Sequence, residues 1–163
     1  MAGMTEVARV EASPGRRMFG LGVLICLGLL LFWLALSQPG GSMFLRIVVL
    51  AIGALAIWAA REMRRATAQA VILTEAGLVE STGTVIAPME QIEAVDRGTF
   101  AFKPSNGFLV RLSQPGPRVW RPGLYWRIGR RVGIGGVAHA AQAKAMADAL
   151  SVMLAERAGA GQG

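Results

Sequence analysis

The chain is poor in the side chains that most enzymes use for chemistry. Its single cysteine, Cys26, excludes any disulfide within the chain. Metal clusters, haem ligation and hydrolytic triads need more than its single histidine, His139, which we expect to be a surface or capping residue. The acids Glu93 and Asp96 are three residues apart, so on a strand they point to opposite faces and form no acid–base pair. The sequence therefore predicts a protein that is not an enzyme and has no metal or cofactor.

Charge is also missing from two long apolar runs. Residues 18–36 hold no charged side chain, and residues 43–60 hold one, Arg46. As α-helices, these runs would each span about 27–28 Å, close to the ~30 Å hydrocarbon core of a bilayer. The uncharged linker 37–42 contains proline and glycine, which end a helix and permit a tight turn. We predict a transmembrane helical hairpin over residues 18–60.

Positive charge flanks this hairpin on the side of both termini. The positive-inside rule then puts both termini in the cytoplasm and the linker outside. Trp33 and Trp58 lie near opposite membrane surfaces, where interfacial tryptophans are enriched. Arg46 lies one turn inside the second helix, where it could snorkel to the outer head groups or contact a partner or a lipid phosphate. Together with Trp33, Arg46 and Trp58, the arginines that flank the hairpin are predicted to lie at the membrane interface. These arginines are Arg16, Arg17, Arg61, Arg64 and Arg65.

The segments on the two sides of the hairpin differ in their sequence patterns. Residues 1–17 show little periodicity, and we expect a mobile tail there. Residues 61–70 contain good helix formers, so they are predicted to form a juxtamembrane helical linker. From residue 71 to about 134, short β-type runs alternate with turn signals, including strong turns at 103–107 and 114–117. This spacing predicts a compact antiparallel sheet or a partly open barrel.

A helix is predicted over residues 138–157, followed by a flexible tail at 158–163. Met146, Leu150, Met153 and Leu154 form one apolar stripe at i, i+4, i+7 and i+8. A sheet followed by one amphipathic helix implies that the helix covers the open side of the sheet. The predicted fold is therefore a membrane α-helical hairpin plus a small cytoplasmic α+β domain over residues 71–157.

This pattern resembles the bacterial pleckstrin-homology-like (PH-like) membrane proteins. The resemblance covers residues 18–157 and rests on the hairpin, on Leu-Thr-Glu-Ala-Gly-Leu at 73–78 and on Arg-Val-Gly-Ile-Gly-Gly at 131–136. It implies a PH-like domain over 71–157, an antiparallel barrel closed by the C-terminal helix at 138–157. The phosphoinositide-binding pattern of eukaryotic members, a lysine followed by Arg-x-Arg on the first β-hairpin, is absent. The resemblance therefore implies no inositide binding.

The glycine-rich turn at 133–138 fits the loose dinucleotide pattern G-x-G-x-x-A, which would place a phosphate at a helix N-terminus. The chain ends about one helix later, with no second strand to complete a βαβ unit and no acid at its tip. Glycines here equally allow a turn and a close approach of helix and sheet. The alternative function is thus a component of a membrane enzyme or transporter complex with weak nucleotide or phosphate binding at this turn.

Residues 97–131 form the most informative charged stretch, with eight basic residues and no acid. Arginines beside aromatic side chains can bind phosphate or a protein partner. Anionic lipid head groups, an acidic face of a larger membrane complex, and a solvated surface with the tryptophans in the core are all compatible. Strand alternation predicts that Arg127 and Arg131 point to one side and Arg130 to the other. The predicted lipid- or partner-binding residues are Arg118, Trp120, Arg121, Trp126, Arg127, Arg130 and Arg131.

Nucleic acid is not expected as a partner, because the chain has no recognition motif and the hairpin tethers it to a membrane. A small-molecule substrate is not expected either. We therefore expect a non-enzymatic inner-membrane protein, an accessory, assembly or scaffold subunit. Its cytoplasmic domain would contact a larger membrane-protein complex or anionic membrane lipid.

Overall fold

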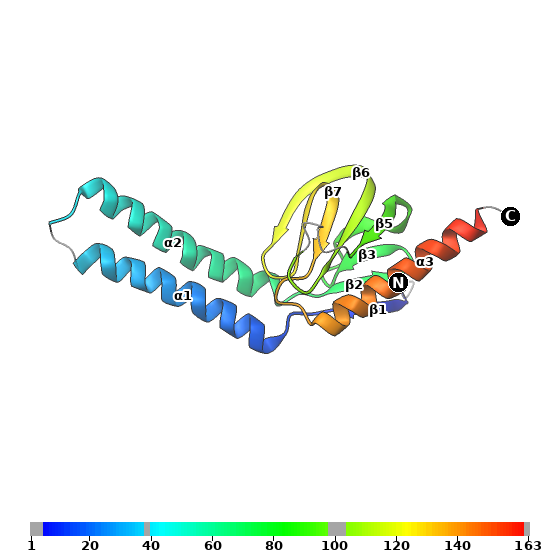
Figure 1. Ribbon diagram of the computed structural model, residues 1–163, viewed down its shortest axis with the longest axis horizontal. Helices are drawn as coiled ribbons and strands as arrows, with labels where there is room; N and C mark the ends of the chain where they lie inside the picture. The colour runs from blue at the N-terminus through cyan, green and yellow to red at the C-terminus, as the bar shows by residue number, and fades with distance from the viewer. Residues whose placement is uncertain (1–4, 38–39, 98–103, 162–163) are drawn as a thin grey trace.

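A computed structural model describes residues 5–37, 40–97 and 104–161. Two long helices form an arm that extends from a smaller domain of strands and one further helix (Figure 1). Helix α1 spans Pro14–Ser37 and α2 spans Met43–Ala66. Both are long and apolar enough to cross a membrane. The predicted helices are found, and α2 continues into the predicted juxtamembrane linker.

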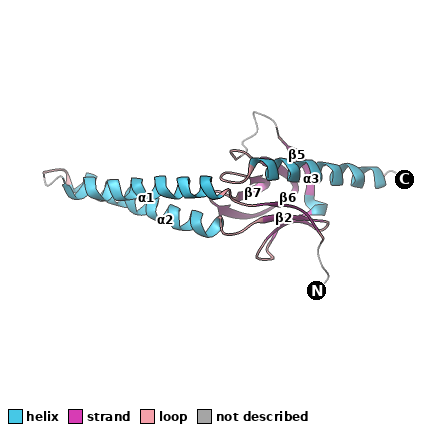
Figure 2. Ribbon diagram, turned by 90° about the horizontal axis from the view of Figure 1, so that it is seen from below, coloured by secondary structure: helices cyan, strands magenta, loops and turns pink. Residues whose placement is uncertain are grey.

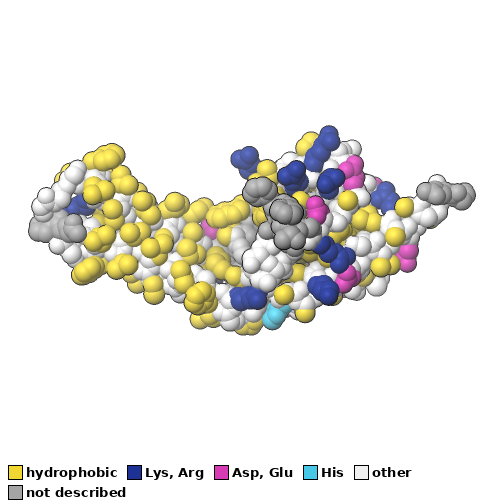
Figure 3. Space-filling model, in the orientation of Figure 1, with side chains coloured by type: hydrophobic (Ala, Val, Ile, Leu, Met, Phe, Trp, Pro, Cys, Tyr) yellow, Lys and Arg dark blue, Asp and Glu magenta, His cyan; other side chains and the backbone are white. Residues whose placement is uncertain are grey.

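The two helices of the arm touch where glycine removes the side chain. A Cβ added to Gly53 would lie 3.2 Å from the carbonyl oxygen of Gly28, and a Cβ added to Gly28 would lie 2.6 Å from Cδ1 of Ile57. Backbones can approach this closely only when small residues face each other. Large apolar side chains point outward instead, and they cover the arm in the space-filling view (Figure 3).

The first sheet is antiparallel and has the order β1-β2-β3-β4. Its strands are β1 (Glu6–Val10), β2 (Val71–Thr74), β3 (Gly77–Glu80) and β4 (Val85–Pro88). Strands β2, β3 and β4 lie in the region from residue 71 onward where short β-type runs between turn signals predict strands.

Strand β1 corrects the prediction of a mobile tail for residues 5–17, while residues 1–4 lie outside the described residues. It pairs with β2, and Val10 is a fully buried partner of Val71. Helix α1 then begins at Pro14. Five residues without clear alternation give little local signal. The partner strand lies beyond the whole helical arm, so the pairing is invisible to a local pattern.

The second sheet is also antiparallel and has the order β5-β6-β7. A 3₁₀ turn, Met89–Gln91, leads from β4 into this sheet. No hydrogen-bonded pairing joins the two sheets among the described strands, so they do not form a closed barrel. The strands are β5 (Ile92–Asp96), β6 (Phe108–Arg121) and β7 (Tyr125–Ile134).

Strand β6 corrects the predicted turn at 114–117, because it runs through that segment without a break. Strand β5 pairs with β6 only as far as Leu112, so Pro115 and Pro117 lie where β6 has a neighbour on one side only. Proline is tolerated on such an edge because its missing N–H breaks no ladder bond. The register of β6 with β7 shifts on both sides of Gly116, which bends the hairpin into the arch seen in Figure 1.

Helix α3 (Ala140–Ala160) completes the domain and contacts β1, β5 and β6. Figure 2 shows it lying against the strands, with its C-terminal end extending beyond them. Met146 and Leu150 are fully buried, while Met153 and Leu154 are half-buried against the same core. The predicted apolar stripe is therefore the face that packs on the sheets. The coarse fold agrees with the prediction, with two apolar helices, antiparallel strands and a C-terminal helix. The described strands form two sheets, however, where one sheet or a partly open barrel was predicted.

Candidate functional site

The β6–β7 hairpin lies against the domain end of α2. The ring of Trp120 on β6 stacks on the ring of Trp58 on α2, with centroids 6.0 Å apart and planes inclined by 24°. Gly123, in the turn between the strands, has a φ of +85°, and a Cβ there would lie 3.1 Å from Cγ2 of Thr67. Glycine meets both requirements, since it adopts positive φ and leaves room for the neighbour. These contacts attach the hairpin to the helical arm.

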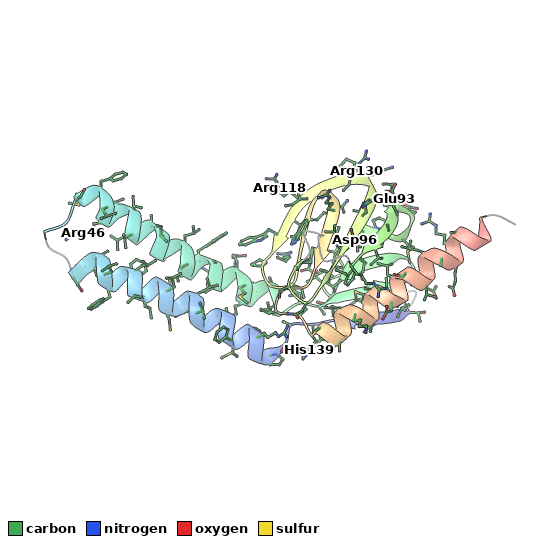
Figure 4. All side chains as sticks on the ribbon, in the orientation of Figure 1. Arg46, Glu93, Asp96, Arg118, Arg130 and His139 are labelled. Atoms are coloured by element: carbon green, nitrogen blue, oxygen red, sulfur yellow. The ribbon has the colours of Figure 1, made fainter. Side chains whose placement is uncertain are left out.

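Five arginines on this hairpin are exposed, and one of them, Arg121, is paired with Glu80. We call the other four the hairpin arginines: Arg111, Arg118, Arg130 and Arg131. In the part of the chain that the structure describes, none of the four forms a salt bridge with a carboxylate. Arg111 and Arg131 are direct cross-strand partners, an arrangement of like charges that disfavours the fold. Figure 4 shows Arg118 and Arg130 projecting from the arch, with Arg118 on the side of the helical arm. Arg111 was not among the predicted binding residues, although it lies in the basic stretch.

Arg127 is a correction, because its side chain is buried. It is 8% exposed, and Nη1 donates a 2.6 Å hydrogen bond to the carbonyl oxygen of Ile86 on β4. The guanidinium crosses Gly116, where an added Cβ would lie 1.8 Å from Nη2. Gly129 has a φ of +57° and lies where the register of β6 and β7 is irregular, so strand alternation fails there. Consequently Arg130 and Arg131 are both exposed, while Arg127 points inward and does not share a side with Arg131.

Arg121 is exposed but already has a partner inside the domain. Its Nε lies 3.3 Å from Oε1 of Glu80, whose side chain is fully buried. The Thr82 hydroxyl donates to the other carboxylate oxygen of Glu80 at 3.1 Å. Burial lowers the pKa of Arg121, but a hydrogen bond with Tyr125 and the charge of Glu80 outweigh it, and the pKa rises overall. Arg121 therefore neutralises a buried acid, a role that the prediction of a binding residue did not include.

Tyr125 and Trp126 belong to the packing of the same hairpin. Burial raises the pKa of the Tyr125 phenol, and the negative charge of Glu80 raises it further. Trp126 is half-buried, and its ring lies over Gly133, where an added Cβ would be 2.4 Å from Cε2. The predicted aromatic contact residues therefore differ: Trp126 packs on the hairpin, while Trp120 stacks on the arm.

The predicted membrane-interface residues separate into the two ends of the arm. Trp33 and Arg46 lie at the end that carries the linker, and Trp58 lies toward the domain end (Figure 4 labels Arg46). At the domain end, Arg65 forms a 3.2 Å salt bridge with Glu62 on its own helix. Arginines gathered at the domain end are Arg16, Arg17, Arg61, Arg64 and Arg65.

The glycine-rich turn at 133–138 uses its N–H groups within the domain. The amides of Gly135, Gly136 and Val137 donate to the carbonyl oxygens of Leu124, Ser105 and Gly123 at 2.9, 2.8 and 3.0 Å. These donors are therefore not free for a phosphate, and the turn instead ties β7 to the β6–β7 connection.

The remaining candidate residues for chemistry do not gather at one place, because His139 lies apart from Glu93 and Asp96 (Figure 4). His139 is exposed at the start of α3 and makes no side-chain capping bond. Glu93 is exposed and Asp96 half-buried on β5. Among the described residues, no group of three His, Cys, Asp or Glu side chains could hold a metal ion.

Comparison with protein-family models, with curated proteins and with solved structures gives no match to this chain. The class is therefore defined by the structure alone. It is an arm of two apolar helices that could span a membrane, joined to an α+β domain whose hairpin arginines form no salt bridge with a described carboxylate.

Proposed function

We propose that the chain is a non-enzymatic bacterial inner-membrane protein, an accessory, assembly or scaffold subunit. Its cytoplasmic domain contacts acidic groups, on a larger membrane-protein complex or on anionic lipid. The observation that carries this proposal is the stacking of Trp120 on Trp58, which holds the β6–β7 hairpin against the arm, with Arg118 on the side of the arm.

The topology of the first sheet supports a domain that lies on one side of the membrane. Strands β1 and β2 flank the arm in sequence, and they are neighbours in the sheet with Val10 paired to Val71. The chain must therefore leave and re-enter the domain on the same side. Arginines gather at that end of the arm, and the positive-inside rule makes it the cytoplasmic end.

The level at which Arg118 lies relative to the membrane supports the proposed contact with acidic groups. Trp58 lies near the end of an apolar span, where interfacial tryptophans sit at head-group level, and Trp120 stacks on it. Arg118 precedes Trp120 by two residues on β6, about 7 Å along a strand. Arg118 thus lies close to the level of the head groups, where anionic lipid or the membrane-proximal face of a complex would meet it.

A PH-like domain is part of this proposal. A four-stranded and a three-stranded antiparallel sheet, followed by one C-terminal helix, support it. The arrangement differs from the expected one in two respects, since the first strand precedes the helical arm and the described strands form two sheets that do not close into a barrel.

The test uses the full-length chain isolated from its native membranes in mild detergent. We expect it to migrate with a larger assembly, or with anionic lipid, in a complex that weakens as salt is raised. Replacing Arg118, Arg130 and Arg131 by glutamine should release it, while Arg9→Gln, which removes an exposed charge on β1, should not. A monomer that binds neither, or one that turns over a nucleotide, would refute the scaffold function.

A further inference from the structure

We propose that the groove between α1 and α2, at the domain end of the arm, binds one anionic phospholipid. An acyl chain lies on the apolar wall of the groove, and the phosphate is held by Arg61 and Arg64. This inference rests on the proposed placement of the arm across the inner membrane. It involves none of the hairpin arginines.

The groove encloses about 420 Å³, within the range of ligand-binding clefts. Both helices supply its apolar wall. The lining residues Leu21 and Ile25 are one turn apart on α1, and Ile57 and Ala60 are one turn apart on α2. All four lie in the uncharged parts of the two apolar helices, so this wall faces hydrocarbon when the arm spans a bilayer.

Arginines line the groove next to this wall, on the side of the domain. Arg65 is held by Glu62 at 3.2 Å. Arg61 and Arg64 are both exposed and form no salt bridge within the described ranges. At a spacing of three residues they are neighbours on the helix surface. Two guanidinium groups with unused donors match the oxygens of a phosphate, which arginine binds through two parallel hydrogen bonds.

The order of these features selects a phospholipid over a free phosphate. Apolar residues come first and arginines follow directly after them, in the direction from the membrane centre to the cytoplasm. A phospholipid has the same order, acyl chain then phosphate. The net positive charge of the groove further favours an anionic head group over a zwitterionic one.

The experiment reconstitutes the full-length chain in nanodiscs with equal amounts of phosphatidylglycerol and phosphatidylcholine. Native mass spectrometry then weighs the lipids that stay bound. We expect the parent chain to retain phosphatidylglycerol in excess. Arg61→Gln with Arg64→Gln should reduce that excess by about fivefold per arginine. Ile25→Trp, which fills the groove without touching a charge, should also reduce it.

The matched control is Arg9→Gln with Lys144→Gln, which removes the same charge from exposed positions on β1 and α3 and should leave the excess unchanged. Soluble glycerol phosphate should not displace the lipid; displacement would show that the apolar wall takes no part. Unchanged enrichment in the Arg61 and Arg64 variant, or a loss confined to the control, would overturn the groove site alone. Release of the chain from native membranes by alkaline carbonate would instead refute the membrane placement.

Discussion

Gly116 and Gly133 each lie beneath a large side chain of β7. The guanidinium of Arg127 crosses Gly116, and the ring of Trp126 covers Gly133. Any Cβ at these positions would overlap the covering group. In the bent hairpin, the side chains of Arg127 and Trp126 thus each lie over a glycine, which has no side chain to overlap them.

Gly116→Ala is expected to destabilise the domain by about 1–3 kcal/mol, the usual cost of overpacking. The added methyl displaces Arg127, which then loses its hydrogen bond to Ile86. Chemical unfolding of the full-length chain measures the change. Gly159→Ala serves as the control, because nothing lies within 4 Å of its added Cβ. Equal stability of Gly116→Ala and the parent would contradict the buried position of Arg127.

Tyr125 provides a prediction about pH. Its pKa is raised above the ordinary value of 10.0, so the folded chain keeps the phenolic proton to higher pH than the unfolded chain does. This contribution to stability is complete below pH 10 and is lost as the pH rises through the folded pKa. The chain has one tyrosine, so phenolate absorbance reports on Tyr125 alone. We expect a higher midpoint in the native than in the denatured chain; identical midpoints would contradict the burial of the Tyr125 phenol near the charge of Glu80.

Helix α3 is held by its apolar stripe, which gives a prediction for a single element. The Leu150 side chain packs in the core and is 0% exposed to solvent. Leu150→Ala should therefore cost about 2–5 kcal/mol of unfolding free energy. Val152→Ala on the same helix removes a side chain that is 55% exposed and should change little. Thermal unfolding compares the two variants, and a stable Leu150→Ala would show that α3 does not pack on the sheets.

Local patterns predicted the elements whose signals are local. The strands β2, β3 and β4 follow β-type runs between turns, and α3 follows a helical stripe. Strand β1 was missed because its partner lies beyond the arm. The continuity of β6 was missed because a Pro-Gly-Pro segment indicates a turn unless it is known to lie on a sheet edge.

The candidate site was less accessible from sequence. Alternation placed Arg127 outside because it assumes an unbroken strand, and the irregularity at Gly129 changes which residues face inward. The stacking of Trp58 on Trp120 joins two elements far apart in the chain, so no spacing rule reveals it. Small residues in the arm were visible, but their spacing did not show that the helices meet at Gly28 and Gly53.

For the whole molecule, topology can be tested by cysteine labelling in a Cys26→Ala background. Ser42→Cys lies in the linker and should react with an impermeant reagent in intact cells. Thr5→Cys and Gly161→Cys should react only after the cells are opened, because β1 and α3 belong to one domain. Labelling of both positions in intact cells would contradict the proposed orientation. Labelling of only one of them would contradict the placement of β1 and α3 in one domain.

The strands that flank the arm, β1 and β2, are paired, so the domain can be made without the arm. Because Val10 and Val71 are antiparallel partners, an Asn-Gly turn between them should replace the arm and close a β-hairpin. This chain should be more stable than residues 71–161 alone by at least about 2 kcal/mol, since it restores a buried valine and a strand ladder. Denaturant unfolding followed by circular dichroism compares them, and equal stability would mean that β1 is dispensable.

The position of β1 also has a consequence during synthesis. A ribosome makes β1 first, then the whole arm, and only afterwards the strand with which β1 pairs. With the arm across the membrane as proposed, the first sheet therefore stays open until β2 has followed both helices back to the side of β1. A chain in which one helix fails to insert would leave β1 and β2 on opposite sides of the bilayer, with Val10 and its partner unable to meet. In the proposed placement, completion of the first sheet thus depends on correct insertion, and a misinserted chain would lack the β1–β2 pairing and be more open to proteolysis.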